Sequence, residues 1–267
     1  MAVQPTLRRP DTADTNASES SAGCKPKSPL ARPMEKLQEV HSHSWYALVI
    51  VLSPLIIAWI EGPDQAGLTD ILANMMPSLS DYRRWGTDPY WLAVVAAMNL
   101  ERVSYTVLWF KADKFKEVVE KSPVLKKKHP VDWVYSGFKF FKLLQFGTAA
   151  WWYLTVAPRV IFADITHVRW AIAVAWISLG QALNVGIYNA IGKDGVYYGF
   201  KLGRNVPWYE GFPFTVIHHP QYMGAILTEW GIFLLLATPA HIVAGWYGLA
   251  VMQSIFYIWT CWVEDQD

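Results

Sequence analysis

The sequence has few charged residues for its length. Charged side chains make up 17% of its 267 residues and apolar ones 53%, whereas a soluble domain usually carries about a quarter charged residues. The net charge is only +1, so bulk electrostatics indicates no nucleic-acid partner. This composition argues against an ordinary soluble domain and favours a protein embedded in a lipid bilayer.

Cysteine is also scarce. Cys24 and Cys261 are the only two, and their positions suggest neither a disulfide framework nor a zinc site. We therefore expect no bound metal. Residues 1–44 are rich in Ser, Ala and Pro and contain five acidic residues, which counts against an acid-poor transit peptide. We expect this segment to be a disordered cytosolic tail.

The apolar residues form six blocks: Trp45–Ile60, Tyr90–Phe110, Phe138–Ala157, Trp170–Ala190, Tyr222–Ala237 and His241–Trp262. Four of them reach about twenty residues, the length needed to cross a hydrocarbon core. Tryptophan and tyrosine at their ends fit the aromatic belts of membrane proteins. Because only helices and closed barrels satisfy backbone groups in lipid, and no strand-like alternation runs through the blocks, we predict an all-α bundle of about six transmembrane helices.

The distribution of basic residues predicts the orientation of the bundle. One face, formed by the tail and the 111–142 and 191–220 connections, holds 18 of the 23 Lys and Arg residues. The positive-inside rule places this face in the cytosol. The run Lys126–Lys128 either sets the topology or binds anionic lipid headgroups, and the first interpretation is favoured.

The stretch from Ile191 to Gly224 differs from the rest of the chain. Between the two apolar blocks it has three prolines, several aromatic residues and five glycines, namely Gly192, Gly195, Gly199, Gly203 and Gly211. Irregular backbone beside a membrane persists where protein or a water-lined cavity satisfies its polar groups, and glycines permit close approach to a ligand. Composition alone does not distinguish this stretch from an ordinary surface loop.

An ordered set of short motifs resembles the phospholipid methyltransferase family, in particular the phosphatidylethanolamine and phosphatidyl-N-methylethanolamine N-methyltransferases, which are related to isoprenylcysteine carboxyl methyltransferases. The resemblance covers about the last eighty residues. Its pieces are Gly192, Gly195, Tyr198 and Gly199; Phe212, Pro213 and Phe214; His219, Pro220, Tyr222 and Gly224; and Glu264 and Asp265. The acidic pair is Glu-Asp instead of the usual Glu-Glu, and relatives usually continue beyond the position of Asp267.

The resemblance implies S-adenosylmethionine as methyl donor and a membrane phospholipid as acceptor. The expected cofactor-binding residues are Gly192, Gly195, Tyr198, Gly199, His219, Pro220, Tyr222, Gly224, Glu264 and Asp265. The expected catalytic residues are His218 and His219, as candidate bases, and Glu229, an intramembrane carboxylate that could hold the substrate cation. Residues 45–190 would then be N-terminal transmembrane helices, and 191–267 the methyltransferase core.

The resemblance further implies N-methylation of phosphatidylethanolamine, or of its mono- and dimethyl derivatives, on the cytosolic side of the endoplasmic reticulum membrane. The main alternative is carboxyl methylation of a prenylated cysteine, which needs a basic residue such as Lys201 or Arg204 near the donor. A non-enzymatic membrane scaffold is a second alternative. The oligomeric state and the number of methyl groups added remain open at this point.

Overall fold

The computed structural model of the protein describes residues 46, 48–50, 52, 86–156, 167–207 and 209–265. The described elements are all helices: α4 (Pro89–Lys121), the short 3-10 helix η1 (Leu125–Lys127), α5 (Pro130–Val156), α6 (His167–Val196), α7 (Pro220–Leu236), α8 (Pro239–Ala244) and α9 (Trp246–Glu264). This confirms the all-α class. The predicted tail, residues 1–44, and most of the block 45–60 lie outside the described residues.

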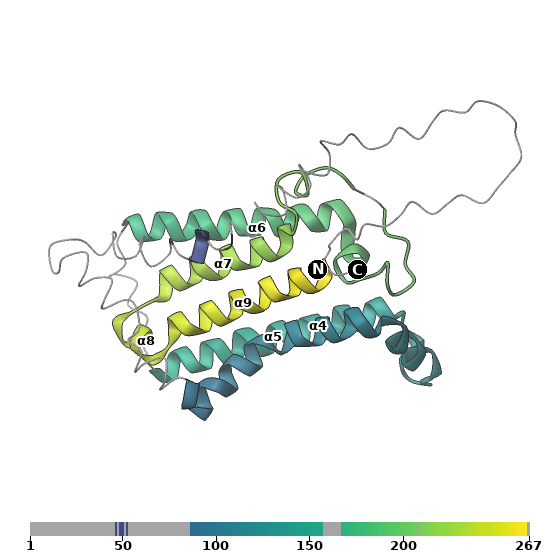
Figure 1. Ribbon diagram of the computed structural model, residues 1–267, viewed down its shortest axis with the longest axis horizontal. Coiled ribbons are helices and arrows are strands. Elements are labelled where there is room, and N and C mark those ends of the chain that lie inside the picture. Colours follow the sequence, from purple (N-terminus) through teal and green to yellow (C-terminus); the bar gives the residue numbers. More distant parts are fainter. Residues whose placement is uncertain are drawn as a thin grey trace, which may run out of the picture.

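The long helices run side by side along one direction (Figure 1). Helix α6 packs along α7, helix α4 packs along α5, and α9 lies between these two pairs in contact with α4 and α7. The α4–α5 connection, the loop after α6 and the last residues of α9 all lie at one end of the bundle. This arrangement brings the glycine-rich stretch and the acidic pair together, although 39 residues separate Gly224 from Glu264 in sequence.

Helix α4 begins and bends where local chemistry dictates. The side chain of Asp88 caps its first turn by accepting a hydrogen bond from the Tyr90 amide at 2.9 Å, and Pro89 occupies the first helical position, where its missing N–H has no cost. Lys111 departs from helical geometry (φ −124°, ψ 25°). The apolar block predicted to end at Phe110 therefore ends at this kink, and a charged helical extension follows.

The last predicted block, His241–Trp262, is not one continuous helix. Gly245 adopts φ +107° and separates the short α8 from α9, a left-handed conformation that favours glycine. The side chain of Thr238 caps α8 by accepting from the His241 amide. The predicted single span is thus wrong in detail, because a turn precedes the helix that carries Glu264.

Within the described residues, one helix is long and apolar enough on its own to cross a membrane. This helix is α6, with 30 residues. The predicted number of six spans is therefore not confirmed by the described helices.

Glycines set the close packing of α6 on α7. A Cβ atom at Gly180 would lie 2.5 Å from the Gly224 carbonyl oxygen, and one at Gly224 would lie 2.7 Å from the Gly180 carbonyl oxygen. Gly231 lies two turns further along α7, and a Cβ atom there would lie 2.9 Å from the Ala173 carbonyl oxygen. Small residues at these positions let two helix backbones approach each other, as they do in membrane helix pairs.

Candidate functional site

A buried carboxylate at the end of α9 is the centre of the site. Glu264 is 3% exposed, and its Oε1 accepts hydrogen bonds from the hydroxyls of Tyr198 and Tyr222. Its second oxygen, Oε2, is buried without a hydrogen-bond partner. Buried carboxylate oxygens are normally satisfied, so this oxygen is available to a donor group supplied by a ligand.

The chain holds Tyr198 in an unusual backbone conformation to make this contact. Its φ is +56°, a region that costs a residue with a side chain about 1–2 kcal/mol. Burial, and secondarily the negative charge of Glu264, raises the pKa of the Tyr198 hydroxyl, which therefore remains a proton donor. Just before it, Gly192 turns the end of α6 with φ +63°. The Glu264 carboxylate thus keeps a hydrogen-bond donor from the glycine-rich loop, the Tyr198 hydroxyl.

Further aromatic rings from α4 surround this pair. Tyr105 and Trp109 meet the Tyr198 ring edge-on, with centroids at 5.8 and 5.3 Å. The hydroxyl of Tyr105 and the indole nitrogen of Trp109 are buried without partners. A cluster of electron-rich rings stabilises a cation by cation–π attraction, which suits both a sulfonium and a methylated ammonium group.

His219 and Asp265 form the second part of the site. His219 is 1% exposed, and its Nε2 lies 3.0 Å from Asp265 Oδ1. Burial raises the pKa of Asp265, but hydrogen bonds from His218 and His219 outweigh this effect and hold the pKa below its ordinary value. An ionised carboxylate can only accept, so Nε2 must carry a proton. In a neutral imidazole the lone pair is then on Nδ1, which is buried without a partner.

The protonation state of His219 follows from its surroundings. Burial lowers the pKa of the imidazole, while the hydrogen bond and charge of Asp265 raise it, and the net direction is downward. The ring is therefore neutral at pH 7 and can accept a proton at Nδ1. This combination of a buried base and an orienting carboxylate is typical of general base catalysis.

His218 lies beside the same carboxylate. Its Nε2 is 3.4 Å from Asp265 Oδ1, and the two imidazole rings are 4.5 Å apart. One ligand atom from each of His218, His219 and Asp265 lies within 4.8 Å of the others, a spacing that a metal ion could use. The 3.0 Å contact of His219 is an ordinary hydrogen bond without any ion, so the absence of a metal stays a prediction.

A charged cluster lies next to the tyrosines, inside the bundle. Glu101 pairs with its neighbour Arg102 and, at 2.8 Å, with Lys142 of α5. The Arg102 guanidinium lies over the rings of Tyr257 at 4.7 Å and Tyr222 at 5.7 Å. Arg102 thereby links the charged cluster to the site tyrosine Tyr222.

The remaining glycines and proline have structural roles in the same region. A Cβ atom at Gly195 would collide with the Ile191 side chain, and one at Gly199 would collide with the Asp194 carbonyl oxygen. Both glycines therefore permit the tight turns at the end of α6. Pro220 starts α7 at its first position. Gly224 faces α6 at the helix contact described above, which accounts for this glycine without a ligand.

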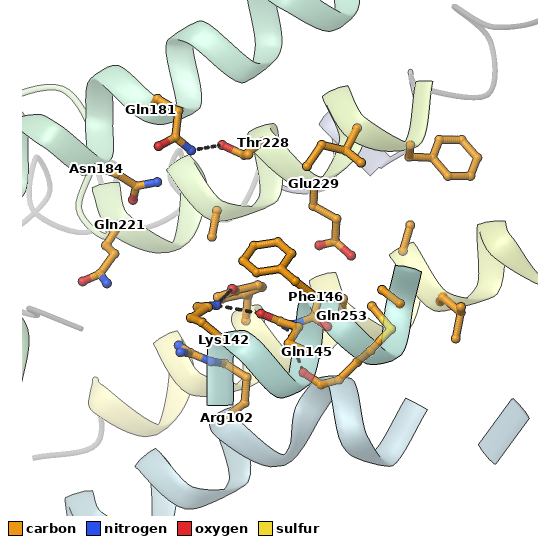
Figure 2. A pocket seen from close by; sticks show the side chains of 18 of the residues that line it. Arg102, Lys142, Gln145, Phe146, Gln181, Asn184, Gln221, Thr228, Glu229 and Gln253 are labelled. Atoms are coloured by element: carbon orange, nitrogen blue, oxygen red, sulfur yellow. Dashed lines mark hydrogen bonds between the residues drawn. The ribbon is translucent and has the colours of Figure 1, made fainter. Parts of the chain in front are cut away.

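Glu229 lies apart from the histidines, in a pocket of about 360 Å³ between α5, α6, α7 and α9. It is two turns beyond Tyr222 on α7, or roughly 10 Å along the helix axis. Figure 2 shows its carboxylate pointing into the pocket, opposite Lys142 and Gln145. The structure therefore brings together His218, His219, Tyr198, Tyr222, Glu264 and Asp265, but separates Glu229 from them.

Residues 168–266 match the sequence model of the family described as phospholipid methyltransferase, which confirms the resemblance over that region. A protein of Arabidopsis thaliana named phosphatidyl-N-methylethanolamine N-methyltransferase is 46% identical over 52 residues, which cover 20% of this chain and 32% of that protein. A protein of Saccharomyces cerevisiae with the same name is 33% identical over 105 residues, 38% of this chain and 48% of that protein. The chain thus spans less than half the length of either relative. No solved structure matches it.

Proposed function

Because residues 168–266 carry the phospholipid methyltransferase match, we propose that this chain transfers methyl groups from S-adenosylmethionine to phosphatidylethanolamine or its mono- and dimethyl derivatives, the steps that lead to phosphatidylcholine. The two relatives named above bear the name of such an enzyme. The observation that carries the proposal is the buried Glu264 carboxylate, bound by two tyrosine hydroxyls and adjoining the His219–Asp265 pair, with one oxygen unused.

The side chains around Glu264 fit the chemistry of the donor. The free Oε2 would accept a charge-assisted hydrogen bond from the donor's ammonium group or ribose hydroxyl. The rings of Tyr198 and Tyr105 tolerate a cation and exclude water. When bound, S-adenosylmethionine would supply a methyl group on a positively charged sulfur. A neutral amine nitrogen would bond to that methyl carbon in line as the carbon–sulfur bond breaks, so that the neutral thioether leaves with the bonding electron pair and the positive charge passes to nitrogen.

The amine of the acceptor must lose a proton before it attacks. A headgroup amine titrates near the lysine value of about 10.4, so it arrives charged at neutral pH. His219 is suited to take this proton at Nδ1, while Asp265 fixes its tautomer through Nε2. His218, more exposed and further from the carboxylate, is the second candidate base.

The acceptor is a membrane lipid, and we propose that the chain spans the bilayer with about six helices. The apolar α6 supports a membrane location. Among the described residues, most Lys and Arg lie in the 111–142 and 191–220 segments, which meet at the end of the bundle that carries the site. This supports a cytosolic active site. We further propose that this membrane is the endoplasmic reticulum. We also propose that the chain divides into a tail, N-terminal transmembrane helices and a methyltransferase core; the family match covers this core and also includes α6.

Carboxyl methylation of a prenylated cysteine is less well supported. It requires a free basic residue near the donor, but Arg204 lies 3.7 Å from the Asp194 carboxylate. Lys201 lies over the Trp109 ring at 3.6 Å. Both basic residues suggested by the sequence are thus engaged in contacts on the loop, and the two relatives carry the name of an N-methyltransferase.

Transfer of labelled methyl groups by the purified full chain tests this proposal. The chain is incubated with labelled S-adenosylmethionine and either phosphatidylethanolamine, its monomethyl derivative, its dimethyl derivative or a prenylcysteine acceptor. We expect alkali-stable label in at least one aminolipid. Label found only as an alkali-labile ester of prenylcysteine would reject the phospholipid assignment and retain a methyltransferase.

A further inference from the structure

The pocket between α5, α6, α7 and α9 contains buried polar groups that have no partner. Arg102 and Gln253 are each 2% exposed and both line the pocket. Nε and Nη1 of Arg102, and both Nε2 and Oε1 of Gln253, make no hydrogen bond. Native structures leave few such groups unsatisfied. The unused donors and acceptors therefore indicate that this pocket takes a polar ligand.

The chemistry of the pocket changes along its length. Near the Tyr222 end it is lined by Arg102 and Gln221. Gln145, Glu229 and Gln253 line its middle, where Figure 2 shows amide and carboxyl groups on opposing helices. Phe233, Trp246 and Leu249 line the far part, towards the α8 end of the bundle. The order from the site inward is thus cationic at Arg102, which reaches the pocket from α4, then polar with both Lys142 and Glu229, then apolar.

This order matches that of a glycerophospholipid, whose amine is followed by a phosphodiester, ester groups and acyl chains. We propose that the pocket binds the acceptor lipid, with its phosphodiester on Arg102, its ester groups beside Gln253 and Glu229, and part of one acyl chain along Trp246. The inference rests on the proposed function. It directs the headgroup amine beyond Arg102 towards Tyr222 and Glu264, where the donor would be held.

Arg102 is well prepared to bind a phosphodiester. Its guanidinium is held between the rings of Tyr105 and Tyr257. Glu101 is shared between Arg102 and Lys142, so the cluster retains an excess of one positive charge. A planar guanidinium presents paired donors that match two phosphate oxygens. An anionic group on the free Nε and Nη1 would satisfy both the charge and the hydrogen bonds.

The route into the pocket lies between α5 and α6. Over the described residues these two helices do not pack along their length; they are joined near the site by the Lys193–Asp132 ion pair at 2.5 Å. Phe146, which lines the pocket from α5, is 60% exposed. An apolar rim between two membrane helices would let a lipid enter sideways from the bilayer with its chains still in the hydrocarbon region.

Two variants test the pocket without altering the residues around Glu264. Gln253→Leu removes hydrogen-bonding groups, and Ala225→Phe fills space on the α7 wall. Val185→Phe adds similar bulk to an exposed position of α6 that does not line the pocket and is the matched control. The probes are phosphatidyl-N-methylethanolamine for turnover, and phosphatidylethanolamine with a photoreactive acyl chain, in nanodiscs, for direct binding.

We expect both pocket variants to raise the acceptor KM and to reduce lipid cross-linking by about fivefold or more. Gln253→Leu would lose one or two hydrogen bonds to the lipid, and Ala225→Phe would take up space that the lipid needs. The Kd of S-adenosylmethionine should stay within about twofold of that of the unaltered chain, because the lipid pocket is separate from the donor site. Unchanged KM and cross-linking in both variants would overturn the proposal, as would an equal loss of donor affinity. Variant-sensitive cross-linking in a chain that methylates no aminolipid would support the lipid pocket and reject the proposed function.

Discussion

Replacing Glu264 by glutamine is expected to weaken S-adenosylmethionine binding by about tenfold or more, because loss of a charge-assisted hydrogen bond costs roughly 1.5–3 kcal/mol. The amide is nearly isosteric and can still contact Tyr198 and Tyr222, so the bundle should fold. Its second polar atom, however, is no longer an anionic acceptor for the donor. Isothermal titration calorimetry on the purified chain measures the effect directly.

Glu117→Gln is the matched control for this experiment. Glu117 carries the same carboxylate on the charged extension of α4, is exposed and pairs with Lys121 one turn away. Its replacement should leave donor affinity unchanged. Equal affinity for Glu264→Gln and the unaltered chain would remove Glu264 from the donor site.

The rate of methyl transfer to an aminolipid is expected to rise as pH increases from about 6 to 9, because the neutral fraction of an amine with a pKa near 10.4 grows throughout that range. The pKa of His219 lies below its ordinary value because of burial. The imidazole is therefore already neutral at pH 7, and its own titration contributes only at the acidic end. A carboxylate acceptor is ionised across the window and should give a flat profile.

His219→Gln tests the base assignment within the same profile. We expect turnover to fall by about 10²–10⁴-fold near pH 7, the usual contribution of a general base, and by less at pH 9, where more amine is neutral without help. Donor affinity should change little. Single-turnover rates on preloaded enzyme separate chemistry from product release. The control is His167→Gln, which replaces an exposed histidine at the start of α6. If His219→Gln lowered turnover by the same factor at all pH values, this would argue against a base at position 219.

The helices of the bundle could be predicted from sequence because apolar blocks report burial in protein or lipid directly. The prediction ended α4's apolar part at Phe110, where the structure has its kink at Lys111. The break at Gly245 was not predicted, since a single glycine within an apolar run does not reveal a positive φ. Nor could composition show that, among the described helices, only α6 combines the length and the apolar character of a span; α7, for example, has 17 residues.

The candidate site was only partly predictable. Motif order was enough to pair Glu264 and Asp265 with the glycine-rich loop, but their division of roles was not foreseen. The structure directs Glu264 to two tyrosines and Asp265 to two histidines. Gly224 belonged to the expected cofactor set, yet its neighbours are backbone atoms of α6.

Residues from α4 were missed because their role depends on how helices pack. Arg102 lies 90 residues before Gly192, the first motif residue of the family resemblance. Its adjacent charged residue, Glu101, explains it locally as an ion-pair partner. Only the packing of α4 against α9, which in turn packs against α7, places it over Tyr257 and Tyr222. The one available signal was an arginine in an apolar block, which is unusual and often functional.

Where the methyl donor binds is the claim on which the whole account depends, and photo-cross-linking measures it most directly. Labelled S-adenosylmethionine is irradiated with the full chain in nanodiscs, and the labelled peptides are mapped, with excess unlabelled donor as the competition control. The account predicts competed label in peptides that contain Tyr198, Tyr222 or Glu264. Competed label confined to α8, at the opposite end of the bundle, would contradict it.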